Sequence, residues 1–149
     1  MSQQRTLIAN WGPVIVWAAM IFYFSTESFS SSQTSRFFGP VLEWVIPGLS
    51  PLQFEIFHFT IRKLGHWTEY FIFAFVVFRA LRREFRSYSS LRHSALTVII
   101  IFLYAVSDEL HQAFVPSRTA SFSDVLLDSF GGLSAIVWLA LVAKWTKKT

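Results

Sequence analysis

Four long apolar segments constrain the fold of this sequence more than any other feature. A bilayer core needs about 20 mainly apolar residues per helix. The segments reach that length at about residues 7–25, 63–81, 94–114 and 123–145. A soluble fold of 149 residues, 53% of them hydrophobic and only 15% charged, could not bury so much apolar surface. The sequence therefore predicts an all-α integral membrane bundle of four transmembrane helices.

We expect residues 1–149 to form a single domain whose first apolar segment is kept as a helix. Arg5 is the only basic residue before that segment. The segment ends in Phe22-Tyr23-Phe24-Ser25 and not in the small residues of a signal-peptide cleavage site. The chain has no cysteines, which excludes disulfides and thiolate metal sites. Its net charge of +4 does not indicate nucleic-acid binding, because the basic residues gather in short connections between apolar segments.

The positions of these basic residues predict how the chain is oriented in the membrane. Lysine and arginine near helix ends favour the cytoplasmic side. We therefore place the connection between the second and third segments, the C-terminus and the N-terminus in the cytoplasm of an inner-membrane protein. The residues that carry this prediction are Arg79, Arg82, Arg83, Arg86, Arg92, Lys144, Lys147 and Lys148.

The last three segments reach spanning length only by including ionisable ends, all of them on the predicted outer side. Within each helix these residues recur three or four positions apart and so share one face. Exposure to lipid would cost several kcal/mol per charge, so the three faces should turn inward and form one pocket. Its residues are Lys63, His66, Glu69, Asp108, Glu109, Gln112, Asp124 and Asp128, with Arg118 from the turn between the last two helices.

The connection at residues 26–62 is predicted to be a long outer loop with an amphiphilic character. Apolar residues cluster at positions 37–46, up to Pro47-Gly48, and again at positions 54–59 after Pro51. Runs this short cannot span a bilayer, but they can lie in its interface as a lid or a shallow helix.

Two kinds of chemistry fit the predicted pocket. His66, oriented by Glu69 and Asp108, is a candidate general base, and the alternative is a hydrogen-bond network that only joins helices. Lys63 and Arg118 are candidates to hold a phosphate or carboxylate.

The acidic residues have two possible uses of their own. Their oxygens suit Mg²⁺ or Ca²⁺, although their spacing matches no metal motif, and salt bridging is the alternative. The sequence thus names no metal and no cofactor. The acidic residues are Asp108, Glu109, Asp124 and Asp128.

Three spaced motifs resemble those of the VanZ-like family. They are K-x-x-H-x-x-E-Y at residues 63–70, S-D-E-x-x-Q-x-F-x-P-x-R at residues 107–118 and D-x-x-x-[ND]-x-x-G at residues 124–131. Tyr23-Phe24-Ser25 also resembles the end of the family's first helix. Asp128 stands where many members carry Asn. The resemblance covers essentially the whole chain.

This resemblance implies a small integral membrane protein of the cell envelope, in a family whose namesake raises resistance to teicoplanin-type glycopeptides. We expect the pocket to bind or modify an anionic, lipid-linked or cell-wall molecule at the outer membrane face. His66, Glu69, Asp108 and Glu109 are the catalytic candidates; the candidates for binding are Lys63, Gln112, Arg118, Asp124 and Asp128. The rival hypotheses are a non-enzymatic assembly partner and a small transporter subunit.

Overall fold

The computed structural model describes residues 3–146, and within that range it contains only helices and short connections. This confirms the predicted all-α class. The elements are α1 (Gln3–Phe24), the 3₁₀ helix η1 (Glu27–Phe29), α2 (Ser31–Val45), α3 (Pro51–Glu84), α4 (Ser90–Ala113) and α5 (Phe122–Trp145).

Three helices are long and apolar enough to cross a membrane: α1 from Arg5 to Phe24, α4 and α5. The longest helix, α3, is outside this group, although its 34 residues extend over about 51 Å. Ionisable residues interrupt its apolar sequence, among them Lys63, Glu69 and Arg79. The structure thus supplies three of the four predicted spans on length and composition alone.

The start of α3 corrects the predicted first loop. The helix begins at Pro51 and not near Lys63, so residues 51–62 are helical. Ser50 and Gln53 form a capping box: Ser50 Oγ accepts from Gln53 N at 3.3 Å, and Ser50 N donates to Gln53 Oε1 at 2.9 Å. Proline is favourable at the first helical position, and Gly48, with φ +81°, allows the preceding turn.

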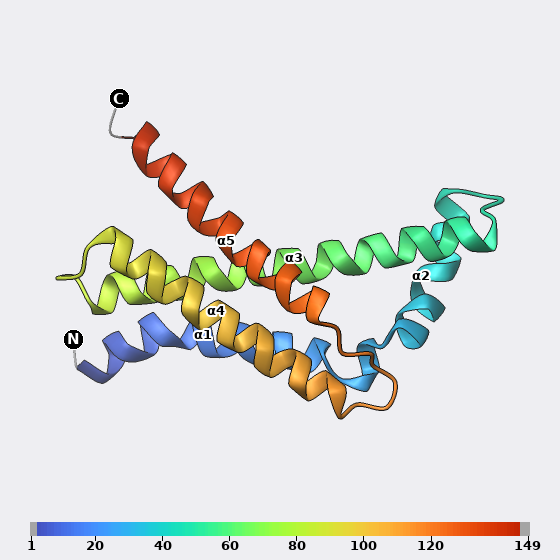
Figure 1. The fold of residues 1–149 in the computed structure, drawn as a ribbon, viewed down its shortest axis with the longest axis horizontal. Coiled ribbons are helices and arrows are strands. Elements are labelled where there is room, and N and C mark those ends of the chain that lie inside the picture. The colour runs from blue at the N-terminus through green and yellow to red at the C-terminus, as the bar shows by residue number, and fades with distance from the viewer. Residues whose placement is uncertain (1–2, 147–149) are drawn as a thin grey trace.

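The core lies where α3 packs against α1, α4 and α5 (Figure 1). Two glycines of α5 permit this close packing. A Cβ on Gly131 would lie 2.5 Å from the backbone oxygen of Trp67, and one on Gly132 would lie 2.6 Å from Ile101 Cγ2. The buried core includes Ile21, Tyr70, Phe73, Ala74, Val77, Leu81, Ile101, Ala105, Val125 and Ala135.

The bundle has two different ends (Figure 1). At one, which we call the arginine end, α1 begins and the connection 85–89 joins α3 to α4. At the other, which we call the polar end, α1 finishes and the connection 114–121 joins α4 to α5. The second half of α5 diverges from the other helices. Lys147 and Lys148, used to predict the orientation, lie outside the described residues.

Beyond the polar end, α2 packs against the first turns of α3 and forms what we call the arm, residues 31–62 (Figure 1). His58 is buried between the two helices: its Nε2 lies 3.0 Å from Thr34 Oγ1, and its ring stacks on Phe54. The predicted amphiphilic segment is therefore a helical hairpin. Its exposed apolar side chains include Phe37, Val41, Trp44, Leu52, Ile56 and Phe59.

Candidate functional site

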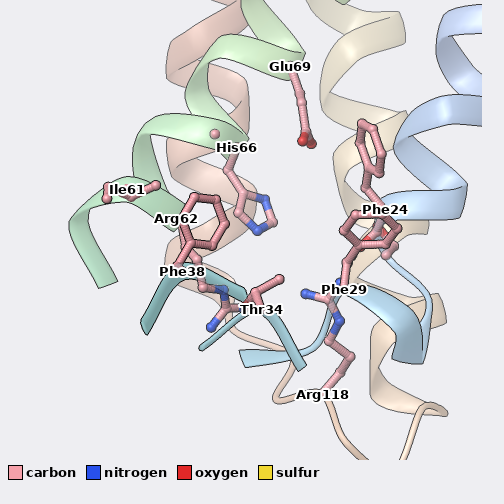
Figure 2. Close-up of a pocket in the computed structure, with 11 residues that line it drawn as sticks. Phe24, Phe29, Thr34, Phe38, Ile61, Arg62, His66, Glu69 and Arg118 are labelled. Carbon is pink, nitrogen blue, oxygen red and sulfur yellow. The ribbon is translucent and has the colours of Figure 1, made fainter. Parts of the chain in front are cut away.

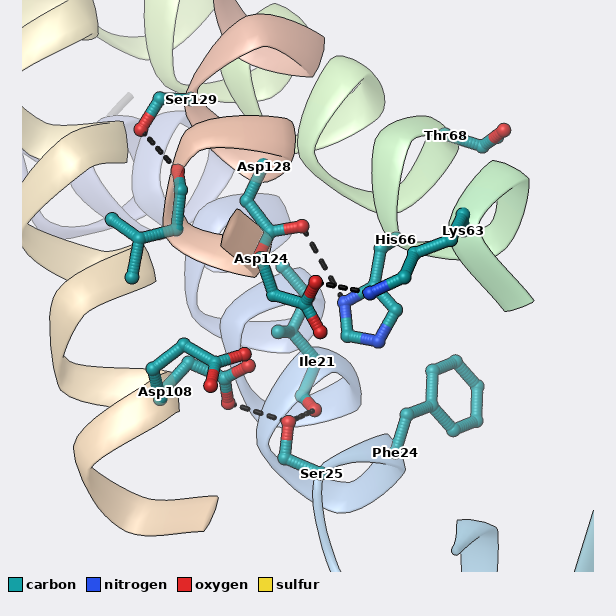
Figure 3. Close-up of polar contacts among 12 residues, drawn as sticks. Ile21, Phe24, Ser25, Lys63, His66, Thr68, Asp108, Asp124, Asp128 and Ser129 are labelled. Carbon is teal, nitrogen blue, oxygen red and sulfur yellow. Dashed lines mark hydrogen bonds and ion pairs between the residues drawn. The ribbon is translucent and has the colours of Figure 1, made fainter. Parts of the chain in front are cut away.

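The residues predicted to share a pocket meet at the polar end, where α1, α3, α4 and α5 come together (Figure 3). The carboxylates of α4 and α5 are buried, whereas the contributions of α3 and of the turn before α5 are partly accessible. The buried set is Asp108, Glu109, Gln112, Asp124 and Asp128, and the partly accessible set is Lys63, His66, Glu69 and Arg118.

His66 faces a different carboxylate from the two suggested by the sequence. Its Nδ1 lies 3.4 Å from Asp128 Oδ1, close enough for an ion pair but longer than a typical hydrogen bond (Figure 3). Asp128 is fully buried, and neither of its oxygens receives a hydrogen bond from the described residues. An uncompensated buried carboxylate is costly, so His66 is the group positioned to neutralise it.

Lys63 forms an ion pair with Asp124, which joins α3 to the first turn of α5. Its ammonium also lies 5.1 Å from the centre of the Phe59 ring. The side chain of Asp124 is 11% exposed and that of Lys63 is 27% exposed, so the pair is only partly open to solvent. Because Asp124 offsets its charge, Lys63 is a weaker anchor for an external anion than the sequence suggested.

Asp108 belongs to a hydrogen-bond network that ties α4 to the end of α1. Its Oδ1 accepts from Ser25 Oγ at 2.5 Å, and its Oδ2 accepts from Gln112 Nε2 at 3.1 Å. Glu109 faces the next connection, where its Oε2 accepts from Ser121 N at 2.8 Å. Gln112 and Glu109 therefore hold the site's walls in place. In the sequence Ser25 stands out only as part of the motif Tyr23-Phe24-Ser25, which does not reveal its partner on α4.

Arg118 fixes the turn between α4 and α5 to the end of α1. Its guanidinium donates to the backbone oxygens of Phe24 and Thr26, the latter from Nε at 3.2 Å. Burial lowers the pKa of Arg118, and the positive charge of Arg62 lowers it further. Two guanidinium groups thus lie near each other at the mouth of the site.

Arg62, His66 and Arg118 line two cavities. The first, about 270 Å³, has mainly apolar walls from α1, η1 and the arm, and Glu69 faces it (Figure 2). The second, about 310 Å³, is lined mainly by polar side chains of α3, of the connection 114–121 and of the first turn of α5. Arg62 is an addition to the predicted site residues, because the sequence predicts residue 62 to end the outer loop whereas the structure places it in α3. A compartment with apolar walls thus adjoins a polar one.

The ionisable residues here combine cations with a titratable imidazole. Among residues 3–146, no three or more His, Asp or Glu side chains are arranged to hold a metal ion. The cations and the His66–Asp128 pair instead provide positive charge and a titratable ring beside a cavity.

An all-α chain with three membrane-length apolar helices and ionisable residues buried where they meet belongs to the class of helical membrane-type proteins. A family model described as VanZ/LLP1 matches residues 11–143. The chain therefore belongs to the VanZ/LLP1 family, which confirms the resemblance seen in its motifs. No curated protein and no solved structure matches the chain.

Proposed function

We propose that the polar end binds the anionic headgroup of an amphiphilic envelope molecule, such as a lipid-linked or cell-wall precursor, and that His66 transfers a proton to or from it. One observation carries the proposal: an apolar cavity and a polar cavity share Arg62, His66 and Arg118. A molecule with a charged head and an apolar tail complements such a pair of compartments.

Arg62 is the group best placed to hold the anion. Among the described residues no carboxylate lies within ion-pair distance of it, whereas Lys63 is already paired with Asp124. Arg118 is anchored to backbone oxygens and so carries a positive charge in a fixed place. A phosphate between Arg62 and Arg118 would relieve their repulsion and accept charge-assisted hydrogen bonds.

His66 is the proton-transfer group in this proposal. Its ring is directed toward the cavity, with Asp128 behind Nδ1 and the Glu69 carboxylate facing the same space (Figures 2 and 3). A carboxylate behind one imidazole nitrogen orients the ring and stabilises its protonated form, which is the usual arrangement of a general base. Asp108 and Glu109 support the walls of the site in this scheme.

We place the site on the outer side of the cytoplasmic membrane. The proposal takes α3 as the fourth span, since it packs among the three candidate spans. Arg82, Arg83 and Arg86 at the arginine end then favour the cytoplasm by the positive-inside rule. The arm would lie in the outer interface with its exposed apolar side chains in lipid, where it can cover a bound molecule.

The two alternatives gain less support from the described residues. A transporter subunit needs a polar path between the bundle's ends, and the tightly packed core around Phe73, Val77 and Ile101 interrupts one. An assembly partner needs only the arm's surface. Replacing exposed Phe37 and Trp44, which line neither cavity of the polar end, by serine separates partner docking from chemistry at the polar end.

The binding part is tested with the purified protein in phosphatidylcholine nanodiscs. A fluorescent polyprenyl phosphate is titrated by microscale thermophoresis against the uncharged polyprenol. We expect the phosphate to bind and Arg62→Ala to weaken it roughly tenfold or more, because a charge-assisted contact is lost. Arg36→Ala, on the exposed face of α2, is the matched control and should bind normally. Equal binding of polyprenol and phosphate, or equal effects of the two variants, would contradict the proposal.

The proton-transfer part is tested in cells whose glycopeptide susceptibility depends on the protein. We expect His66→Gln to abolish this phenotype while leaving polyprenyl phosphate binding within about twofold, because glutamine cannot transfer a proton whereas the anion is held by Arg62 and Arg118. Membrane insertion of the variant is checked by its amount in the membrane fraction. Full cellular activity of an inserted His66→Gln protein would rule out the proton-transfer role.

A further inference from the structure

The arginine end contains a cavity that is separate from the proposed outer site. It has a volume of about 390 Å³, and its lining comes from the last turns of α3, from Arg86 just beyond them and from Leu139 of α5. Leu139 belongs to the half of α5 that diverges from the other helices (Figure 1). Arg79, Arg82, Arg83 and Arg86 line it. It shares no lining residue with either cavity of the polar end.

The charges of this cavity have one sign only. Arg79, Arg82 and Arg83 follow the spacing i, i+3 and i+4 and so share one face at the end of α3, and Arg86 follows in the connection 85–89. In the described part of the chain, no carboxylate lies within ion-pair distance of any of them. The carboxylate nearest in sequence, Glu84, instead accepts a hydrogen bond from Asn10 of α1. Like charges at these spacings repel, so the cavity favours an external anion.

The remaining walls of the cavity are apolar. Phe75 and Phe78 of α3 and Leu139 of α5 line it beside the arginines. Phe75 is 39% exposed, and its ring also contacts Trp138 of α5, with 6.3 Å between ring centroids. The apolar walls therefore continue along the outside of both helices, in the direction that a hydrocarbon chain would take from a headgroup held by the arginines.

We infer that this cavity binds the headgroup of an anionic phospholipid. Guanidinium groups bind phosphodiester oxygens in bidentate fashion, and basic pockets between transmembrane helices suit anionic headgroups. The acyl chains would lie against Phe75, Phe78 and Leu139. A bound lipid would thus contact both α3 and α5.

The test uses the full chain, purified in zwitterionic detergent, with intrinsic fluorescence and thermal melting as readouts. Phosphatidylglycerol is titrated against phosphatidylcholine with the same chains, and inorganic phosphate is a third arm. We expect saturable binding of phosphatidylglycerol, a higher melting temperature with it, and no effect of phosphatidylcholine. Equal effects of the two lipids would overturn the inference. Displacement by millimolar inorganic phosphate would also overturn it, because it would mark a free-anion site.

Paired variants locate the lipid. Arg79→Gln/Arg83→Gln should weaken phosphatidylglycerol binding roughly tenfold, because two charge-assisted contacts are lost. Arg92→Gln is the matched control, since Arg92 lies over the Tyr88 ring outside the cavity, and it should bind normally. An equal loss of phosphatidylglycerol binding in the paired variant and in Arg92→Gln would indicate that only the general surface charge matters, and would overturn the inference. If the glutamine pair fails to fold, Arg79→Lys/Arg83→Lys replaces it and should show a smaller loss, because lysine lacks the bidentate fork; unchanged binding would count against the site.

Discussion

The two ends of α3 carry ionisable residues in opposite ways. Toward the polar end they are partly or wholly buried and matched by opposite charges: Lys63 faces Asp124, and His66 faces Asp128. At the arginine end Arg82 and Arg83 are exposed and have no carboxylate partner among the described residues. One helix thus joins a compensated, internal cluster to an uncompensated, surface one.

This difference separates what each end can do. Buried charges that compensate one another form a fixed electrostatic environment before any ligand arrives, which suits specific binding and proton transfer. Uncompensated surface charges depend on an outside partner and make a weaker contribution to the fold. Of the cations Arg62, Lys63 and His66 that α3 contributes to the cavities, only Arg62 has no carboxylate partner among the described residues, and for that reason we assign the anion to it.

The largest expected effect on stability comes from forcing α3 and α5 apart near the polar end, where the compensated charges lie. Gly131→Ala should lower the free energy of unfolding by about 3 kcal/mol, the upper end for overpacking, because its Cβ would lie 2.5 Å from the Trp67 backbone oxygen. Gly12→Ala is the matched control: a Cβ there meets nothing within 4 Å, so helix propensity should make it neutral or stabilising by up to about 1 kcal/mol. Unfolding in mixed detergent, followed by circular dichroism, measures both. Equal stability of the two variants would show that close approach of these helices is not required.

A medium effect is expected from removing one charge of a compensated pair. Lys63→Ala should cost about 2 kcal/mol, less than a fully buried pair because its side chain is 27% exposed. The double variant Lys63→Ala/Asp124→Ala should recover part of this loss, since no unpaired carboxylate remains. Arg83→Ala, at the other end of the same helix, should change stability by no more than about 0.5 kcal/mol. The same unfolding assay decides, and a loss at Arg83 as large as at Lys63 would remove the contrast between the ends.

The position of the site could be predicted from the sequence because its residues break apolar runs at helical spacing. Asp108, Gln112, Asp124 and Asp128 could not face lipid, so they had to face one another. Which of these carboxylates pairs with which cation of α3 could not be predicted, because the pairing depends on the position of α5 along the axis of α3. The contact of Gly131 with Trp67 fixes this axial position, and at that position Asp128, and not Glu69 or Asp108, faces His66.

The start of α3 carries a helix-capping signal that is visible in the sequence but is not used in the predicted boundaries. Residues 54–59 are predicted from the sequence to lie in the outer loop, as a lid or a shallow helix, because their apolar run is too short to span a bilayer. The motif Ser50-Pro51-Leu52-Gln53 nevertheless has the spacing of a capping box with proline at the first helical position. With the helix predicted to begin near Lys63, Arg62 lies outside it and therefore outside the predicted site.

The smallest expected effect sharpens the role of Arg62 as the uncompensated cation of the polar end. Burial lowers the pKa of His58 below its ordinary 6.5, and the charge of Arg62 lowers it further. When α2 detaches from α3, His58 regains its ordinary pKa and binds more protons at pH values below about 6.5 than it does when buried. The packing of α2 against α3, which we call docking, should therefore weaken as the pH falls through that value. Protection factors of α2 amides, measured by hydrogen exchange, should therefore be lower at pH 5.5 than at pH 7.5.

Two variants assign this pH dependence. His58→Gln cannot be protonated but keeps an N–H that can reach Thr34 Oγ1, as the ring's Nε2 does at 3.0 Å, so it should remove the pH dependence while α2 stays docked. Arg62→Ala should reduce the pH dependence without abolishing it, because burial is the larger cause of the lowered pKa of His58. The same fall in protection in wild type and His58→Gln would transfer the effect to another group. An unchanged pH dependence in Arg62→Ala would mean that the charge of Arg62 is already neutralised, which would remove the reason for assigning the anion to it.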